Sequence, residues 1–112
     1  MRIVVVDEND ERVEIVRQGL RAAGHAIVAT IGPRDDLLAT LEAVPADFVI
    51  ASMSSPDRDT LDGLRAVTAR NPKPIVLFVD HSDAALARDA VDAGVSAYIV
   101  KGLAADLSLI HI

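Results

Sequence analysis

The 112-residue chain contains no cysteine, and this absence excludes disulfides, thiolate catalysis and cysteine-based zinc sites together. Aromatic residues are also scarce: Phe48, Phe78 and Tyr98 are the only ones, too few for a platform on which nucleic-acid bases would stack. No apolar run approaches the roughly 18 residues that a membrane-spanning helix needs. The N-terminal apolar run ends at Asp7, too early for a signal peptide. The sequence therefore predicts a cytoplasmic globular domain without a membrane segment.

Positive charge is in short supply as well. Eleven basic side chains stand against seventeen acidic ones, and the resulting formal charge of −6 is spread along the chain. A negative domain without a basic face repels nucleic acid and anionic lipid, so we expect this domain to bind neither of them directly. Hydrophobic residues make up 51% of the sequence, which is enough for one compact core over residues 1–112 without a disulfide or metal.

Short, mostly apolar and β-branched runs alternate along the chain with longer amphipathic stretches. Runs that are apolar throughout are typical of strands buried on both faces, as in a parallel sheet. The predicted strands are 2–6, 25–30, 47–51, 74–79 and 96–100.

Each predicted strand is followed by a segment whose apolar residues recur at helical spacing. Gly24 and Gly94 stand where left-handed helix ends are needed, and Ser82 is placed to cap the fourth helix. The alternation predicts an α/β, flavodoxin-like, doubly wound fold, in which a five-stranded parallel sheet of order 2-1-3-4-5 is flanked by five helices. The residues that mark the five helices are Val13, Val16, Leu20 and Ala23; Leu37, Leu38, Leu41 and Val44; Leu61, Leu64 and Val67; Ala87, Ala90 and Val91; and Leu103, Leu107 and Ile110.

Function in such sheets collects at the carboxyl ends of the strands, and the first strand ends in two acids. The carboxylates of Asp7 and Glu8 could hold Mg²⁺ through oxygen ligands. The alternative is that Glu8, Asp10 and Glu11 only favour the first turn of the next helix through its dipole. No glycine-rich or hydroxyl-rich loop follows to cradle a phosphate, which argues against a nucleotide-binding or flavin-binding fold.

Serines gather at the end of the third strand, at positions 52, 54 and 55. A serine hydrolase is disfavoured because Gly-x-Ser-x-Gly is absent and no histidine stands in a triad order, so a loop is the better interpretation. Lys101 follows the fifth strand, where it is either a point charge for a phosphoryl group or a solvated cap. The histidines lack metal-ligand spacing and are interpreted as surface or loop residues, with only His81 near the strand ends; they are His25, His81 and His111.

The acid pair Asp7-Glu8, the loop with Pro56 and Asp59, and Lys101 resemble the receiver domain of two-component response regulators, and the resemblance covers the whole chain in order and spacing. Two strings, SPDRDTL at 55–61 and AGVSAY at 93–98, are similar to receivers of the ANTAR group (AmiR and NasR transcription antitermination regulators), NasT-like proteins. The resemblance implies a CheY-like fold and a signalling role without enzymatic turnover.

Two positions depart from the family's pattern. The phosphoryl-accepting Asp of the family stands four residues before the loop proline, which is Ser52 here, and the switch hydroxyl at the end of the fourth strand falls on Val79. That family forms an acyl phosphate on a carboxylate in contact with Mg²⁺, so the resemblance implies a pseudo-receiver that needs no cofactor. Its acidic pocket would comprise Asp7 and Glu8, which bind Mg²⁺ weakly if at all, with Ser54 nearby, and Lys101 would be the equivalent of the phosphoryl contact.

ANTAR regulators continue past the fifth helix into a coiled coil and a small helical RNA-binding domain, so we expect such an output domain beyond Ile112. The expected partner is a second copy, bound through the fourth-helix and fifth-strand face or through the fifth helix, or another regulatory protein; a sensor histidine kinase is a further candidate. Two alternatives stay open: a receiver that is still phosphorylated, and a flavodoxin-like ligand-binding domain or enzyme.

Overall fold

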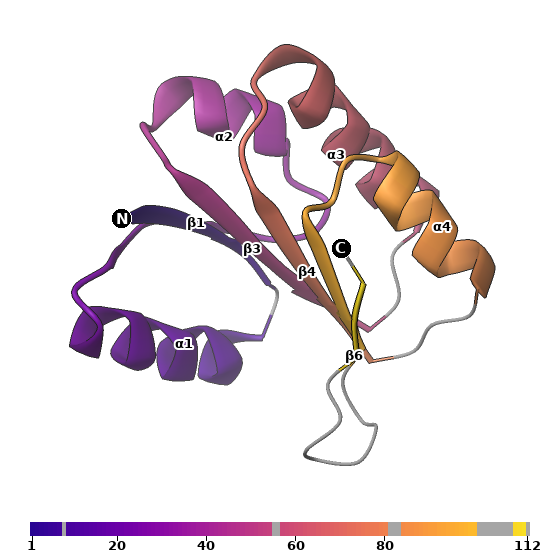
Figure 1. The fold of residues 1–112 in the computed structure, drawn as a ribbon. Coiled ribbons are helices and arrows are strands. Elements are labelled where there is room, and N and C mark those ends of the chain that lie inside the picture. Colours follow the sequence, from indigo (N-terminus) through magenta and orange to yellow (C-terminus); the bar gives the residue numbers. More distant parts are fainter. Residues whose placement is uncertain (8, 55–56, 81–83, 101–108, 112) are drawn as a thin grey trace.

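The computed structural model describes residues 1–7, 9–54, 57–80, 84–100 and 109–111 of the chain. Five parallel strands form the sheet, in the order β2-β1-β3-β4-β5, and the short strand β6 extends it beyond β5 (Figure 1). The strands are β1 (Arg2–Val6), β2 (Ala26–Ile31), β3 (Phe48–Met53), β4 (Ile75–Val79), β5 (Ala97–Val100) and β6 (Leu109–His111). The parallel sheet and its strand order are therefore as predicted.

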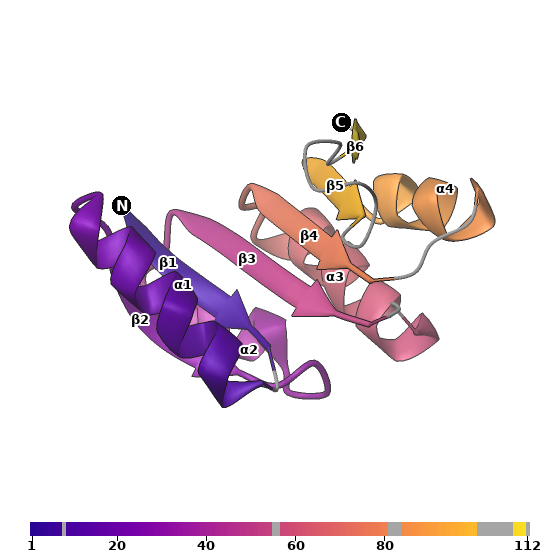
Figure 2. The same cartoon turned by 90° about the horizontal axis from the view of Figure 1, so that it is seen from below.

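Helices cover both faces of this sheet (Figures 1 and 2). Helix α1 (Asp10–Ala22) lies on one face, and α2 (Leu37–Ala43), α3 (Arg58–Arg70) and α4 (Ala84–Asp92) lie on the other. Each helix turns its apolar stripe to the sheet, because an amphipathic helix is stable only where that stripe is buried. The doubly wound α/β arrangement is therefore as predicted.

The prediction of a fifth helix is wrong at its C-terminal end. The described residues hold four helices, and Ile110, predicted to be helical, lies in β6, opposite Ile99 of β5. Strand β6 runs antiparallel to β5 and gives hydrogen-bond partners to an edge that would otherwise stay open. Leu103 and Leu107, which mark the rest of the predicted helix, lie outside the described residues, as does the predicted cap Ser82.

The core has two parts, one on each face of the sheet. Between the sheet and helices α2, α3 and α4, the fully buried side chains include Val49, Leu77 and Tyr98. Between the sheet and α1, Val13 packs with Ile3 and Val5 in a smaller cluster. Successive residues of β1, from Ile3 to Val6, belong alternately to the two clusters, which is the period of two expected of a strand buried on both faces.

Local signals end two of the helices as predicted. Gly24 follows α1 with φ of 87°, and Gly94 follows α4 with φ of 101°. In this left-handed region a side chain is strained, and glycine is not.

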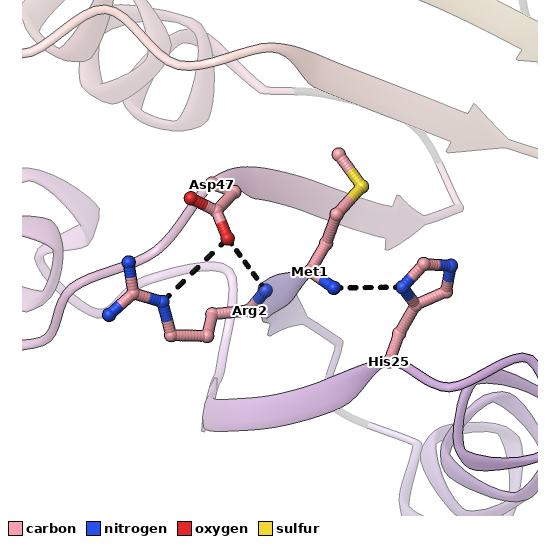
Figure 3. Close-up of polar contacts among 4 residues, drawn as sticks. All are labelled: Met1, Arg2, His25 and Asp47. Carbon is pink, nitrogen blue, oxygen red and sulfur yellow. Dashed lines mark hydrogen bonds and ion pairs between the residues drawn. The ribbon is translucent and has the colours of Figure 1, made fainter.

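Polar contacts join the amino ends of three neighbouring strands (Figure 3). The backbone N–H of Arg2 donates to Asp47 Oδ2 at 2.8 Å, and the Arg2 Nε lies 3.7 Å from the same oxygen. The N–H of Arg2 and the guanidinium charge hold the pKa of Asp47 below its usual value. The N-terminal amine lies 2.9 Å from His25 Nδ1, which agrees with the prediction of a surface or loop position for this histidine. These contacts lie at the end of the sheet opposite the predicted site.

Candidate functional site

Asp7 and Ser52 lie side by side at the carboxyl end of the two central strands. In the register of β1 and β3, Val6 lies opposite Ala51, so the residues that follow them, Asp7 and Ser52, are neighbours. Both are buried, with 4% of Asp7 and 7% of Ser52 exposed. Strand alternation directs both side chains to the face that α1 covers. The structure thus brings together two of the predicted site residues.

The backbone around Asp7 holds its carboxylate in place. Its N–H donates to the carbonyl of Ile31 at 2.9 Å, which continues the pairing of β1 with β2 by one residue. Its Oδ1 accepts the N–H of Asn9 at 3.0 Å, and this turn leads into α1. An aspartate that bonds the backbone two residues on is a turn-forming device. Asp7 therefore forms the turn that precedes α1, in addition to lying at the predicted site.

Val79 lies on the other face of the sheet from Ser52. It pairs with Met53 on one side and Val100 on the other, and its side chain is fully buried in the core beneath α3 and α4. The residue of β4 that lies opposite Ser52 is Phe78. Val79 is therefore a core residue, and in this structure its side chain does not face the predicted pocket.

The loops after β3 and β4 are joined by one backbone bond. The N–H of Asp80 donates to the carbonyl of Ser54 at 3.0 Å, so the pairing of the two strands extends past their ends. Ser54 itself is exposed. Three of the predicted residues, Glu8, His81 and Lys101, lie outside the described residues.

The oxygen ligands among the described residues do not by themselves form a magnesium site. Mg²⁺ prefers several oxygen ligands, with carboxylates among them, and the described part of the pocket offers Asp7 beside a neutral serine hydroxyl. Across the described residues, no group of three or more acidic or histidine side chains is placed to hold a metal ion. Glu8, the other predicted ligand, lies outside the described residues, so the weak Mg²⁺ site at Asp7 and Glu8 stays a prediction.

Asp57 has a structural role that the sequence interpretation missed. It is the N-cap of α3, where its Oδ1 accepts the N–H of Thr60 at 2.7 Å. This bond, the Thr60 hydroxyl and the nearby charge of Arg34 hold the pKa of Asp57 below its ordinary value. The signal was present, because Asp is a preferred residue immediately before a helix. Asp36 caps α2 in the same way through the N–H of Ala39.

We expect Asp57→Ala to lower the free energy of unfolding by about 1 kcal/mol at neutral pH, through loss of the cap. Because folding lowers the pKa of Asp57, its contribution is complete above the unfolded-state pKa, near 3.8, and is lost as the pH falls through the lower folded-state value. Urea titrations at several pH values measure this difference. Asp59→Ala, in the first turn of the same helix but not at the cap, is the control and should cost less. A difference that stays constant through the acid range would contradict the assignment.

Comparisons with known proteins agree with this geometry. The model of the response regulator receiver domain matches residues 3–111. The transcriptional regulatory protein PdtaR of Mycobacterium tuberculosis is 30% identical over 101 residues, which are 89% of this chain and 49% of that protein. The C4-dicarboxylate transport transcriptional regulatory protein DctD of Rhizobium meliloti is 30% identical over 105 residues, 93% of this chain and 23% of that protein. The chain thus spans half or less of the length of these relatives.

Solved structures share the fold. A CheY-like receiver from Methanospirillum hungatei superimposes with a TM-score of 0.77 at 19% identity, over 92% of this chain and 82% of that one. A LuxR-family two-component response regulator from Aurantimonas has a TM-score of 0.76 at 25% identity, over 90% and 74% of the two chains. None of the described helices is long and apolar enough to cross a membrane. The chain belongs to the response regulator receiver domain family, the signalling domain of two-component systems.

Proposed function

We propose that this chain is a pseudo-receiver of the ANTAR type, which signals through protein contacts without accepting a phosphoryl group at residue 52. The observation that carries the proposal is the position of Ser52. It is the β3 residue beside Asp7, buried at the carboxyl edge of the sheet where the family places its acceptor carboxylate.

The chemistry of the side chain supports this proposal. An acceptor carboxylate is ionised at neutral pH, attacks phosphorus directly and shares an oxygen with the metal. A serine hydroxyl is neutral, needs a base to remove its proton and is a poor ligand for Mg²⁺. The adjacent carboxylate of Asp7 accepts the N–H of Asn9, so one of its oxygens is already engaged.

An ANTAR output is the second part of the proposal. The strings at 55–61 and 93–98 support it, and the match to PdtaR, a transcriptional regulator twice as long, is consistent with a further domain. In this proposal the receiver controls RNA-binding antitermination in the cytoplasm through a homodimer or a regulatory protein. The net charge of −6 favours a protein partner for this domain over direct contact with RNA.

Acetyl phosphate or beryllofluoride with Mg²⁺ is expected to leave the unaltered protein unchanged, because the carboxylate that would form the acyl phosphate is missing. Mass spectrometry of the intact chain, recorded in acid before an acyl phosphate hydrolyses, measures the result. A receiver with an intact acceptor, treated in parallel, verifies the reagents. Stoichiometric gain of one phosphoryl group would refute the proposal and establish the alternative of a working receiver, whichever side chain accepts.

Homodimer formation is expected at high concentration, through the α4 face. Val91 is 42% exposed there and offers an apolar contact to a second copy of the chain. Light scattering over a concentration series measures the mass. Val91→Asp should shift the equilibrium to monomer, while Ile15→Asp, on the exposed side of α1, should not. A monomer throughout the series would contradict this part of the proposal.

A further inference from the structure

A pocket lies beside the candidate site, on the opposite face of the sheet. It has a volume of about 140 Å³ and opens between the carboxyl ends of β1 and β3, the loop before α2, and the first turns of α3. Its floor is apolar and buried, formed by Val6, Leu37, Ala51, Met53 and Leu64. In open parallel sheets, ligands bind at the carboxyl ends of the strands where the strand order reverses, and β1 and β3 flank that point here.

The walls of this pocket are held by hydrogen bonds. In the loop after β2, Asp35 Oδ2 accepts the N–H of Gly32 at 2.7 Å, and the N–H of Asp35 donates to the carbonyl of Gly32 at 3.1 Å. Across the opening, the cap of Asp57 on Thr60 orders the first turn of α3. Helices α2 and α3 pack against one another behind the pocket. A ligand would therefore enter a largely pre-formed site, which lowers the cost of ordering on binding.

Size and charge indicate the kind of ligand. A cavity of about 150 Å³ lined by aliphatic side chains can hold a benzene molecule, so this floor accommodates an apolar group of that size. The rim carries Arg34, Asp35 and Asp59. Arg34 is the one positively charged residue among the described residues that line the pocket, against the two carboxylates. Asp35 and Asp59 leave the mouth of the pocket negative, within a domain that is negative overall.

We propose that this pocket is a binding site for a small organic cation, whose apolar body fills the space above Ala51 and Met53 and whose ammonium group lies between Asp35 and Asp59.

The position of the pocket connects it to the candidate site. Ala51 and Met53 line the pocket and are the neighbours of Ser52 in β3, and Val6 immediately precedes Asp7. A ligand on one face of these strands therefore contacts the residues that flank both polar side chains on the other face. This would give the domain a chemical input at the place where other receivers take a phosphoryl group. The inference does not depend on whether Ser52 is inert.

Glycine 63 offers a direct test, because it lines the pocket from α3 and a Cβ placed on it meets no heavy atom within 4 Å. Gly63→Ala and Gly63→Leu therefore add increasing volume to the pocket. Gly19→Ala is the matched control: it makes the same change in helix α1, also has open space around the new Cβ, and lies outside the pocket. Thermal unfolding verifies that each variant is folded.

The experiment is a titration of the ¹⁵N-labelled chain with benzylamine, benzyl alcohol and benzoate at low salt, followed by amide chemical shifts. We expect saturable shifts centred on residues 6, 51 and 53 for benzylamine, with affinity falling at least about threefold for the alcohol and further for benzoate. Gly63→Leu should lower the affinity for benzylamine at least about tenfold, and Gly63→Ala should lower it less. Gly19→Ala should leave the affinity unchanged. The absence of saturable shifts, equal affinity in the folded Gly63→Leu variant, or tighter binding of benzoate would each overturn the proposal. None of these outcomes bears on phosphorylation of Ser52, which the acetyl phosphate experiment tests separately.

Discussion

Replacing Ser52 by Asp is expected to convert a chain that gains no phosphoryl group from acetyl phosphate into one that does. The new carboxylate would lie beside Asp7, at the carboxyl end of β3, in a position that is 7% exposed. Two buried neighbouring carboxylates repel one another, and a divalent cation relieves this repulsion. The variant should therefore be less stable than the unaltered chain without Mg²⁺, and should regain stability as Mg²⁺ is added.

Two measurements test this expectation. Thermal unfolding with increasing Mg²⁺ should raise the midpoint of Ser52→Asp and leave that of the unaltered chain nearly constant. Intact-mass spectrometry after acetyl phosphate should then show a partially modified variant. We expect incomplete modification because Val79 is buried on the opposite face of the sheet and has no hydroxyl to bond phosphoryl oxygens.

Matched variants separate charge from position. Ser52→Asn has nearly the shape of the Asp variant without its charge, and Ser54→Asp places the same carboxylate two residues further along, at an exposed position. Neither should gain Mg²⁺-dependent stability or a phosphoryl group. If Ser52→Asp is folded and still binds no Mg²⁺, the assignment of residue 52 to the acceptor position is wrong.

Gly94→Ala is expected to destabilise the domain strongly. Gly94 has φ of 101°, and a Cβ added to it would lie 2.6 Å from the Cγ2 of Thr68 and clash with the hydroxyl of the same residue. That hydroxyl donates to the carbonyls of Ala93 at 2.8 Å and Leu64 at 3.1 Å, so Thr68 cannot turn away without losing both bonds. Backbone strain costs about 1–2 kcal/mol and overpacking about 1–3 kcal/mol, so the free energy of unfolding should fall by about 2–5 kcal/mol.

Urea denaturation measures this loss as a lower midpoint with an unchanged slope. Gly24→Ala is the control for strain alone, because Gly24 has φ of 87° and no heavy atom within 4 Å of an added Cβ. Gly24→Ala should lower the free energy of unfolding by about 1–2 kcal/mol. The double variant Gly94→Ala, Thr68→Ala should cost less than the sum of the two single changes, since the clash is removed. Equal losses for Gly94→Ala and Gly24→Ala would show that Thr68 does not restrict this turn.

The central strands β1 and β3 were predictable from the sequence because they are largely buried on both faces. Such strands read as continuous apolar runs, so the run at 2–6 coincides with β1, and the predicted 47–51 differs from β3 by one residue at its start and two at its end. The helix ends at Gly24 and Gly94 were predictable for an equally local reason, because a positive φ requires a residue without a Cβ. The position of Ser52 relative to Pro56 likewise follows from the chain alone.

The tertiary structure determined which of these residues lie close together. Leu109–His111 is short, and two of its three residues are apolar, so the segment suits a helix or a strand. It pairs with the edge of β5 as β6. The cap role of Asp57 followed only from the position at which α3 begins, which the structure gives as Arg58. The register of β1 with β3 brings Asp7 beside Ser52, and alternation along β4 turns Val79 into the opposite core. A sequence lists residues at the ends of strands, whereas pairing and side-chain direction, which depend on neighbouring strands, determine which of them form one site.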